Sequence, residues 1–236
     1  MIINKIIAVE GLDKTGKSTF CDAFEMVFSQ MMGINKQKLK RFSFPNASTP
    51  IGKTIRDELN SSNPDKDIVS TPNFLSEMSH YWMQELFKNR EIINKNNINT
   101  NNQIVNTNLL NKTNYIFDRY FISTLAYQAF YNNSRVDLEF IKTALNTNSF
   151  IKMPTDIIFM DIPNDKILER TIADQKNGNT DSNDTLDMDI IDKRRDAYIK
   201  SLNFIKGNGV NIHWFEDTSV YKPSDLSKVL MGKIFQ

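Results

Sequence analysis

The sequence has a single cysteine, Cys21, among its 236 residues. One thiol cannot form an internal disulfide or a metal site of several cysteines, which fits a reducing compartment. No apolar run approaches the roughly 20 residues that a membrane helix needs, and residues 1–10 carry neither a basic segment nor a small-residue cleavage site. We therefore expect a cytoplasmic protein that makes no membrane contact.

The chain also lacks an excess of charge of one sign. Its 29 lysines and arginines face 28 acidic residues, for a net charge of +1, so nothing favours a nucleic-acid partner and any anion site must be built locally. Hydrophobic residues make up 40% of the chain, which is enough for a buried core. The length fits one α/β domain over residues 1–236.

Short apolar runs alternate with helical patterns along the chain. Strands are expected at 6–9, 39–44, 115–118, 156–162 and 210–215, and helices at 18–31, 51–59, 71–93, 122–131, 165–172, 188–206 and 224–235. This alternation implies right-handed crossovers and a doubly wound parallel sheet with helices on both faces. Between 94 and 114 about every second residue is asparagine, which predicts an exposed, mobile insertion that is dispensable for chemistry.

A glycine-bracketed loop follows the first expected strand. The pattern Gly11-x-x-x-x-Gly16-Lys17-Ser18 stands between that strand and a helix, where converging N–H groups and the helix N-terminus bind phosphate. Lys17 would reach the β- and γ-phosphates of ATP, and the Ser18 hydroxyl would ligate Mg²⁺. The predicted nucleotide-binding residues are Gly11, Leu12, Asp13, Lys14, Thr15, Gly16, Lys17, Ser18 and Thr19.

A carboxylate and an arginine end the third expected strand. In a parallel sheet, Asp118 and Arg119 then lie at the carboxyl edge where ligands bind. Asp118 would hold Mg²⁺ or orient an acceptor phosphate, and Arg119 would bind phosphate oxygens through paired N–H groups. A GTPase is excluded, because no Asn-Lys pair in the chain is followed by aspartate at the spacing of the guanine motif.

Four segments together resemble the thymidylate kinase family of nucleoside monophosphate kinases. They are Glu10 to Thr19, Phe44-Pro45-Asn46 with the following Ser48 to Lys53, Asp118 to Gln128, and Pro154-x-Asp156 with Asp161-Ile162-Pro163 and Arg170. The resemblance implies a P-loop NTP hydrolase-like three-layer fold with a five-stranded parallel sheet flanked by helices. It also implies a lid at 173–187, a homodimer, and ATP- and Mg²⁺-dependent phosphorylation of dTMP to dTDP.

The same resemblance implies roles for individual residues. Asp13 would bond the deoxyribose 3′-hydroxyl, Arg119 would bind the acceptor phosphate, and Phe44 with Pro45 would pack near the thymine. Four more residues would surround the base: Ser123, Thr124, Tyr127 and Gln128. The catalytic residues implied by the motifs are Lys14, Lys17, Asp118 and Arg119.

The sequence departs from the family around the acceptor. Ser43 stands where an arginine often precedes Phe-Pro, with Arg41 two residues earlier, while Ala47 and Tyr81 stand at two further arginine positions. Two alternatives therefore stay open. One is a kinase of dUMP or another deoxynucleoside monophosphate, and the other is a catalytically weak nucleotide-binding protein.

The transition-state charge needs a mobile cation. The loop slot that holds a catalytic arginine in some relatives holds Lys14 here, and we predict that Lys14 supplies this charge. The alternatives are Lys176 in the lid and Arg194 or Arg195 on the following helix. Cys21 is predicted to be a small buried apolar residue rather than a reactive thiol.

Overall fold

The computed structural model describes residues 5–32, 38–61, 66–95, 113–131, 138–147, 151–178 and 184–235. Its centre is a five-stranded sheet in the order β2-β3-β1-β4-β5, in which every neighbouring pair is parallel. The strands are β1 (Ile6–Glu10), β2 (Lys38–Ser43), β3 (Thr113–Asp118), β4 (Asp156–Met160) and β5 (Asn211–Phe215). All five strands expected from the sequence are confirmed, with small shifts at their ends.

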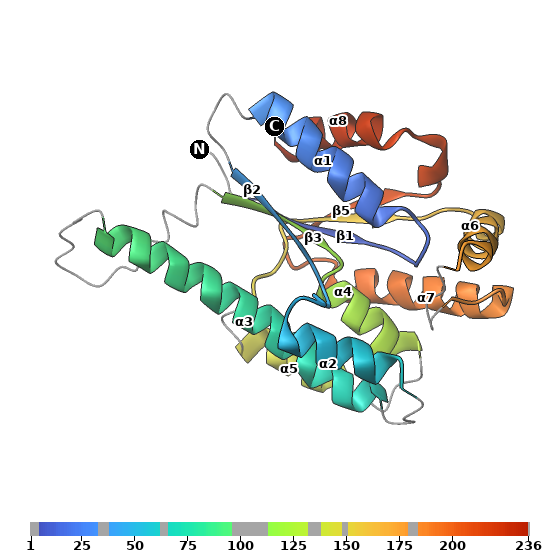
Figure 1. Ribbon diagram of the computed structural model, residues 1–236, viewed down its shortest axis with the longest axis horizontal. Helices are drawn as coiled ribbons and strands as arrows, with labels where there is room; N and C mark the ends of the chain where they lie inside the picture. Colours follow the sequence, from blue (N-terminus) through green and yellow to red (C-terminus); the bar gives the residue numbers. More distant parts are fainter. Residues whose placement is uncertain are drawn as a thin grey trace.

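Helices cover both faces of this sheet (Figure 1). On one face lie α1 (Lys17–Met32) and α8 (Pro223–Ile234), and on the other lie α3 (Lys66–Lys95), α4 (Phe121–Thr124) and α7 (Met188–Ile205). A hydrophobic core lies on each face of the sheet, and alternate residues of β1 belong to one or the other. Ile7 and Val9 pack toward α1, while Ala8 packs toward the opposite face. The three-layer α/β fold is therefore confirmed.

The long helix α3 begins earlier than the sequence predicted. We expected Thr71-Pro72 to open it, but the helix starts at Lys66 and carries Pro72 in its interior. Proline there removes one backbone hydrogen bond. The packing of this stretch compensates, because Ser70, Thr71 and Leu75 are buried.

The segment after β3 is also helical, as expected, but in two forms. One turn of α-helix, α4, passes into the wider π-helix η3 (Leu125–Tyr131). Three further helices are α2 (Pro50–Leu59), α5 (Leu138–Thr147) and α6 (Asn164–Lys176). The helix α5 was not expected from the sequence. The helix α6 was expected to end at residue 172 but extends to Lys176, into the range assigned to the lid.

The asparagine-rich range is bounded by regular structure. Asn94 belongs to α3, and Asn114 is a buried residue of β3 whose amide accepts from the Lys5 N–H at 2.9 Å and donates to the Lys38 carbonyl at 3.3 Å. The expectation that Asn114 belongs to an exposed insertion is wrong, because its amide bridges two neighbouring strands. Residues 96–112, like 179–183 of the predicted lid, lie outside the described residues.

None of the helices in the described ranges combines the length and the apolar character that a membrane span needs.

Cys21 is fully buried in α1, and burial raises the pKa of its thiol well above the ordinary value. Its assignment as a buried apolar residue is confirmed.

Candidate active site

The loop between β1 and α1 approaches the neighbouring strand closely at Gly11. This residue has a φ of 145°, and a Cβ atom there would lie 2.3 Å from the carbonyl oxygen of Met160 on β4, so only glycine fits. Gly16 also has a positive φ, 89°, directly before Lys17 opens α1. The first N–H groups of α1 therefore face the loop without helical partners, as an anion site requires.

Lys17 is buried at the start of α1 and bends back over the loop. Its ammonium donates to the Leu12 carbonyl oxygen and lies 3.5 Å from the Thr15 hydroxyl oxygen. Burial lowers the pKa of Lys17 to about 8, and the nearby Arg119 guanidinium also lowers it. The neighbouring carboxylates act in the opposite direction and raise this pKa. A phosphate in the loop would favour the charged ammonium and offset this loss.

Ser18 and Asp118 meet where β3 ends. The Ser18 hydroxyl donates to Asp118 Oδ2 at 2.5 Å, and the Asp118 side chain is 9% exposed. Both groups offer the hard oxygens that Mg²⁺ prefers, and in nucleotide sites this ion takes only one or two protein ligands beside phosphates and waters. The pair fits such an ion. No cluster of three or more His, Cys, Asp or Glu that could hold a metal by itself occurs in the part of the chain that is described.

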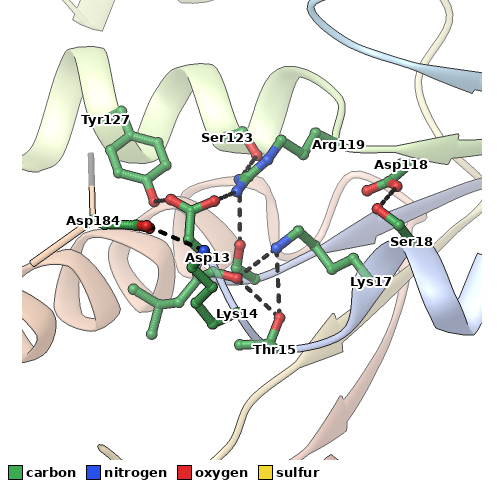
Figure 2. Close-up of polar contacts among 12 residues, drawn as sticks. Asp13, Lys14, Thr15, Lys17, Ser18, Asp118, Arg119, Ser123, Tyr127 and Asp184 are labelled. Atoms are coloured by element: carbon green, nitrogen blue, oxygen red, sulfur yellow. Dashed lines mark hydrogen bonds and ion pairs between the residues drawn. The ribbon is translucent and has the colours of Figure 1, made fainter. Parts of the chain in front are cut away.

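Arg119 lies in the turn after β3 and joins several elements (Figure 2). Its Nη1 donates to the Tyr198 hydroxyl at 2.8 Å, and to Ser123 Oγ and the Gly11 carbonyl at 3.3 Å each. Its Nη2 forms an ion pair with Asp13. The guanidinium is thus held beside the phosphate loop, as the sequence predicted for the carboxyl edge of the sheet.

Asp13 is kept ionised by this arrangement. One carboxylate oxygen pairs with Arg119, and the other accepts a hydrogen bond from the Tyr127 hydroxyl at 3.3 Å. Burial opposes ionisation, but the charges of Arg119, Lys17 and Arg194 outweigh it and hold the pKa of Asp13 at about 2. The side chain remains 39% exposed, so this carboxylate is available to a ligand.

A cavity of about 840 Å³ opens at this edge of the sheet. Asp118 lies on the wall of this cavity. So do most of the substrate-binding residues that the resemblance implies, which are Asp13, Phe44, Pro45, Arg119, Ser123, Tyr127 and Gln128. Thr124 is buried next to them, and its hydroxyl has no hydrogen-bond partner among the described residues. The π-helix η3 contributes Tyr127, Gln128 and Tyr131 to the wall, so the unusual helical form serves the cavity.

Several wall residues were not assigned from the sequence. They are Arg41, Arg56, Phe74, Tyr131 and Arg194. Arg194, an alternative source of the transition-state charge in the sequence analysis, lines this larger cavity, with its guanidinium 5.5 Å from the Tyr131 ring centre. These positions are scattered over five elements, so no local motif identifies them.

Arg41 is the one residue of this group that the sequence could have indicated. It stands two positions before Ser43 on β2, and residues two apart share one face of a strand. Its Nη2 lies 3.5 Å from Asp118 Oδ2 and donates to the Ser18 carbonyl oxygen at 3.2 Å. Tyr81, in contrast, is packed among aromatic rings, with its ring centre 4.0 Å from that of Phe42, and supplies no charge to the cavity.

A second cavity of about 440 Å³ lies along the other side of the loop. Its wall includes Thr15, Gly16 and Thr19 from the loop and α1, Arg170 from α6, and Ser219 from the short 3₁₀ helix η4 (Thr218–Val220). Leu12 belongs to the loop, and Lys17 is the first residue of α1. The nine predicted nucleotide-binding residues thus form one continuous segment, which runs from the loop into the first turn of α1.

Lys14 also lines the second cavity but is engaged by carboxylates. Its ammonium lies 2.7 Å from Asp174 and 3.2 Å from Asp184, while its carbonyl oxygen accepts from Arg170 at 2.6 Å. The catalytic role predicted for Lys14 therefore requires these ion pairs to open. Lys176, the alternative, is an exposed residue at the end of α6.

A phosphate loop that contributes residues to two cavities, with an aspartate and an arginine at the end of the adjacent strand, defines a P-loop nucleotide kinase. The profile described as thymidylate kinase matches residues 9–212. The chain belongs to the thymidylate kinase family and is a phosphotransferase, a nucleoside monophosphate kinase. No curated protein sequence matches it significantly.

Solved structures show the same fold. The thymidylate kinase of Ehrlichia chaffeensis aligns with a TM-score of 0.60 and 16% identity, over 99% of this chain and 100% of that chain. The thymidylate kinase of Candida albicans aligns with a TM-score of 0.60 and 19% identity, over 99% of this chain and 92% of that chain. At these identities the similarity shows the fold alone.

Proposed function

We propose that this kinase transfers the γ-phosphoryl group of ATP to dTMP and releases ADP and dTDP. An oxygen of the acceptor phosphate attacks the γ-phosphorus, and the bond from that phosphorus to the bridging oxygen breaks, so ADP leaves with the electron pair. The observation that carries the proposal is that one loop supplies Asp13 and Ser18 to the larger cavity and Lys14 and Thr19 to the smaller one. Direct transfer needs both nucleotides on one phosphate loop at once.

The larger cavity suits the acceptor. Its volume of about 840 Å³ holds a nucleoside monophosphate, Arg119 is fixed toward it, and Asp13 offers a carboxylate to the sugar. The smaller cavity then takes the adenosine of ATP, whose phosphates lie on the loop near Lys17. Ser18 and Asp118 would hold Mg²⁺, and when bound this ion neutralises charge on the phosphates.

One buried polar atom supports a pyrimidine base. Gln128 lines the cavity with a side chain that is 3% exposed, and its amide oxygen has no hydrogen-bond partner in the described structure. A buried acceptor without a partner is costly, and the N3–H of thymine or uracil would satisfy it. Cytosine carries an acceptor at N3 and would leave the same oxygen unsatisfied. The aromatic wall from Phe44 and Phe74 supplies an apolar surface for a ring.

Turnover with a panel of monophosphates tests the proposal. In the presence of ATP and Mg²⁺, we expect kcat/KM to be highest for dTMP, then for dUMP, and much lower for dCMP, dGMP and dAMP. One methyl group in an apolar pocket is worth about 1–3 kcal/mol, so dTMP should exceed dUMP by about 10- to 200-fold at most. The Candida albicans thymidylate kinase is described as having broad substrate specificity.

The same panel separates the alternatives. ADP formation that is fastest with dGMP or dAMP would overturn the acceptor-site assignment and leave only the donor site. No ADP formation with any monophosphate, together with measurable ATP binding, would indicate the catalytically weak nucleotide-binding protein.

We expect Lys14→Ala to lower kcat by about tenfold or more, which corresponds to about 1.4 kcal/mol, and to change both KM values less. The reason is that a cation which reaches the transferring phosphoryl group only in the transition state contributes to kcat. Steady-state kinetics with dTMP measure the effect, with Asp174→Asn as the matched variant, because it removes one restraint on Lys14 and should not reduce kcat. An unchanged kcat in Lys14→Ala would transfer the role to Lys176, Arg194 or Arg195.

A further inference from the structure

Glu10, the last residue of β1, is a fully buried carboxyl group to which the proposed reaction assigns no role. Both of its oxygens bond to the segment that carries Arg119. Oε1 accepts the Tyr120 N–H at 2.8 Å, and Oε2 accepts the Ser123 hydroxyl at 2.6 Å. One buried side chain thus contacts both the turn and the first helical residues after it.

The turn needs such support because of its backbone. Arg119 has a φ of 69°, in the left-handed region that residues with a Cβ atom rarely adopt. Backbone of this kind persists only where the surroundings hold it. Here the Arg119 N–H donates to the Val9 carbonyl oxygen at 3.0 Å and the next N–H donates to Glu10, so β1 holds both peptide groups.

The direction of the hydrogen bonds extends this support to the guanidinium. Because the Ser123 hydroxyl hydrogen points to Glu10, Ser123 Oγ is left as an acceptor for its other partners. Those partners are Arg119 Nη1 at 3.3 Å and the Tyr198 hydroxyl at 2.9 Å, and the Tyr198 oxygen accepts from Arg119 at 2.8 Å. An ionised Glu10 therefore keeps two acceptors turned toward Arg119.

We propose that Glu10 is a positioning residue for the acceptor phosphate, which acts through the Ser123 hydroxyl and the turn at Arg119 without touching either nucleotide. The inference rests on the proposed function in that it assigns Arg119 to the acceptor. The position of the Arg119 guanidinium then depends on the buried Glu10 carboxylate.

Protonation of Glu10 would reverse this arrangement. Burial raises the pKa of Glu10 to about 7, and the bond from Ser123 and the charge of Arg119 oppose that rise. The charged and titratable groups that face it are Lys17 from α1, Arg119 from the turn and Tyr198 from α7. Below about pH 7 the protonated Oε2 would donate to Ser123, and acceptor affinity should fall, whereas above that pH the carboxylate form restores it.

Glu10→Gln tests the inference, because glutamine keeps an acceptor for the Tyr120 N–H and places a donor against Ser123. We expect the Kd of dTMP to rise roughly 10- to 100-fold, as misplacing a binding group does, while the Kd of ATP changes less than about twofold. The ratio of variant to wild-type Kd for dTMP should also change around pH 7. The second ionisation of the dTMP phosphate is common to both proteins and cancels in that ratio.

Two further variants make the test decisive. Glu85→Gln changes an equally buried glutamate that bonds to Lys40 and Tyr115, and it should leave the Kd of dTMP unchanged. Ser123→Ala should weaken dTMP binding by itself, and adding Glu10→Gln to it should have little further effect, since both act on one path. If Glu10→Gln does not fold, the ratio of the Ser123→Ala Kd to the wild-type Kd for dTMP must still change around pH 7.

The outcomes that overturn the inference are specific. They are an unchanged Kd of dTMP in Glu10→Gln, equal losses of dTMP and ATP binding, or full additivity with Ser123→Ala. Turnover of the panel by the wild-type enzyme decides the proposed function separately. A wild-type enzyme that phosphorylates dTMP while Glu10→Gln behaves like it would refute this inference alone.

Discussion

Replacing Lys17 by alanine is expected to lower turnover by at least about 10²- to 10³-fold, the loss typical of removing one preorganised group that stabilises transition-state charge. Lys17 is held at the start of α1 with its ammonium over the loop, close to the Leu12 carbonyl and the Thr15 hydroxyl. The β- and γ-phosphates of ATP would replace these contacts. ADP release with dTMP as acceptor measures the effect.

Two controls accompany the Lys17 variant. Lys228→Ala removes a 61% exposed lysine of α8, the helix that packs beside α1, and should leave kcat unchanged. Thermal unfolding of Lys17→Ala should show a folded protein, because alanine at this position removes a buried charge rather than an apolar contact. A folded Lys17→Ala that retains wild-type turnover would refute the donor-site assignment.

Replacing Arg119 by alanine should raise the KM of dTMP by about 10- to 100-fold, since hydrogen bonds to a charged group are worth about 1.5–3 kcal/mol. Arg119 is fixed by Tyr198, Ser123 and Asp13 on the wall of the larger cavity. ATP lies on the other side of the loop in the proposed complex, so its Kd should change little. Steady-state kinetics and equilibrium ATP binding provide the two measurements.

Arg119→Lys serves as the matched variant. It keeps the positive charge next to Asp13 but loses the paired N–H groups, so its KM for dTMP should lie between those of the wild type and Arg119→Ala. If ATP binding collapses in Arg119→Ala while dTMP binding is retained, Arg119 belongs to the donor site.

The phosphate loop and the sheet could be predicted from the sequence because both are encoded by residues that are close together in the chain. A loop that contains Gly11 and Gly16 and directly follows an apolar strand is typical of a phosphate-binding site. Its geometry requires glycine at position 11, where the backbone lies close to Met160. The inner strands β1, β3 and β4 followed from short apolar runs, since strands buried on both faces are largely apolar. The strands β2 and β5 lie at the edges of the sheet and are only partly buried. The position of Asp118 and Arg119 at the carboxyl edge followed from the same reasoning.

Other features depend on contacts between distant segments. Pro72 lies inside α3 because the buried residues around it outweigh the lost backbone bond. Asn114 is buried because its amide bridges Lys5 and Lys38, which are remote from it in the chain. Neither outcome follows from local propensity, which is a weak guide where tertiary packing opposes it.

By itself, the sequence determined the fold class, the order of the strands along the chain, and the phosphate loop, because each of these is encoded by neighbouring residues. Only the tertiary structure decided that Arg41 reaches Asp118, that carboxylates engage Lys14, and that Glu10 supports Arg119 through Ser123. The Glu10–Ser123 contact joins positions 113 residues apart. The physical reason is that hydrogen bonds and ion pairs act over a few ångströms, so they depend on which side chains the packed fold brings together.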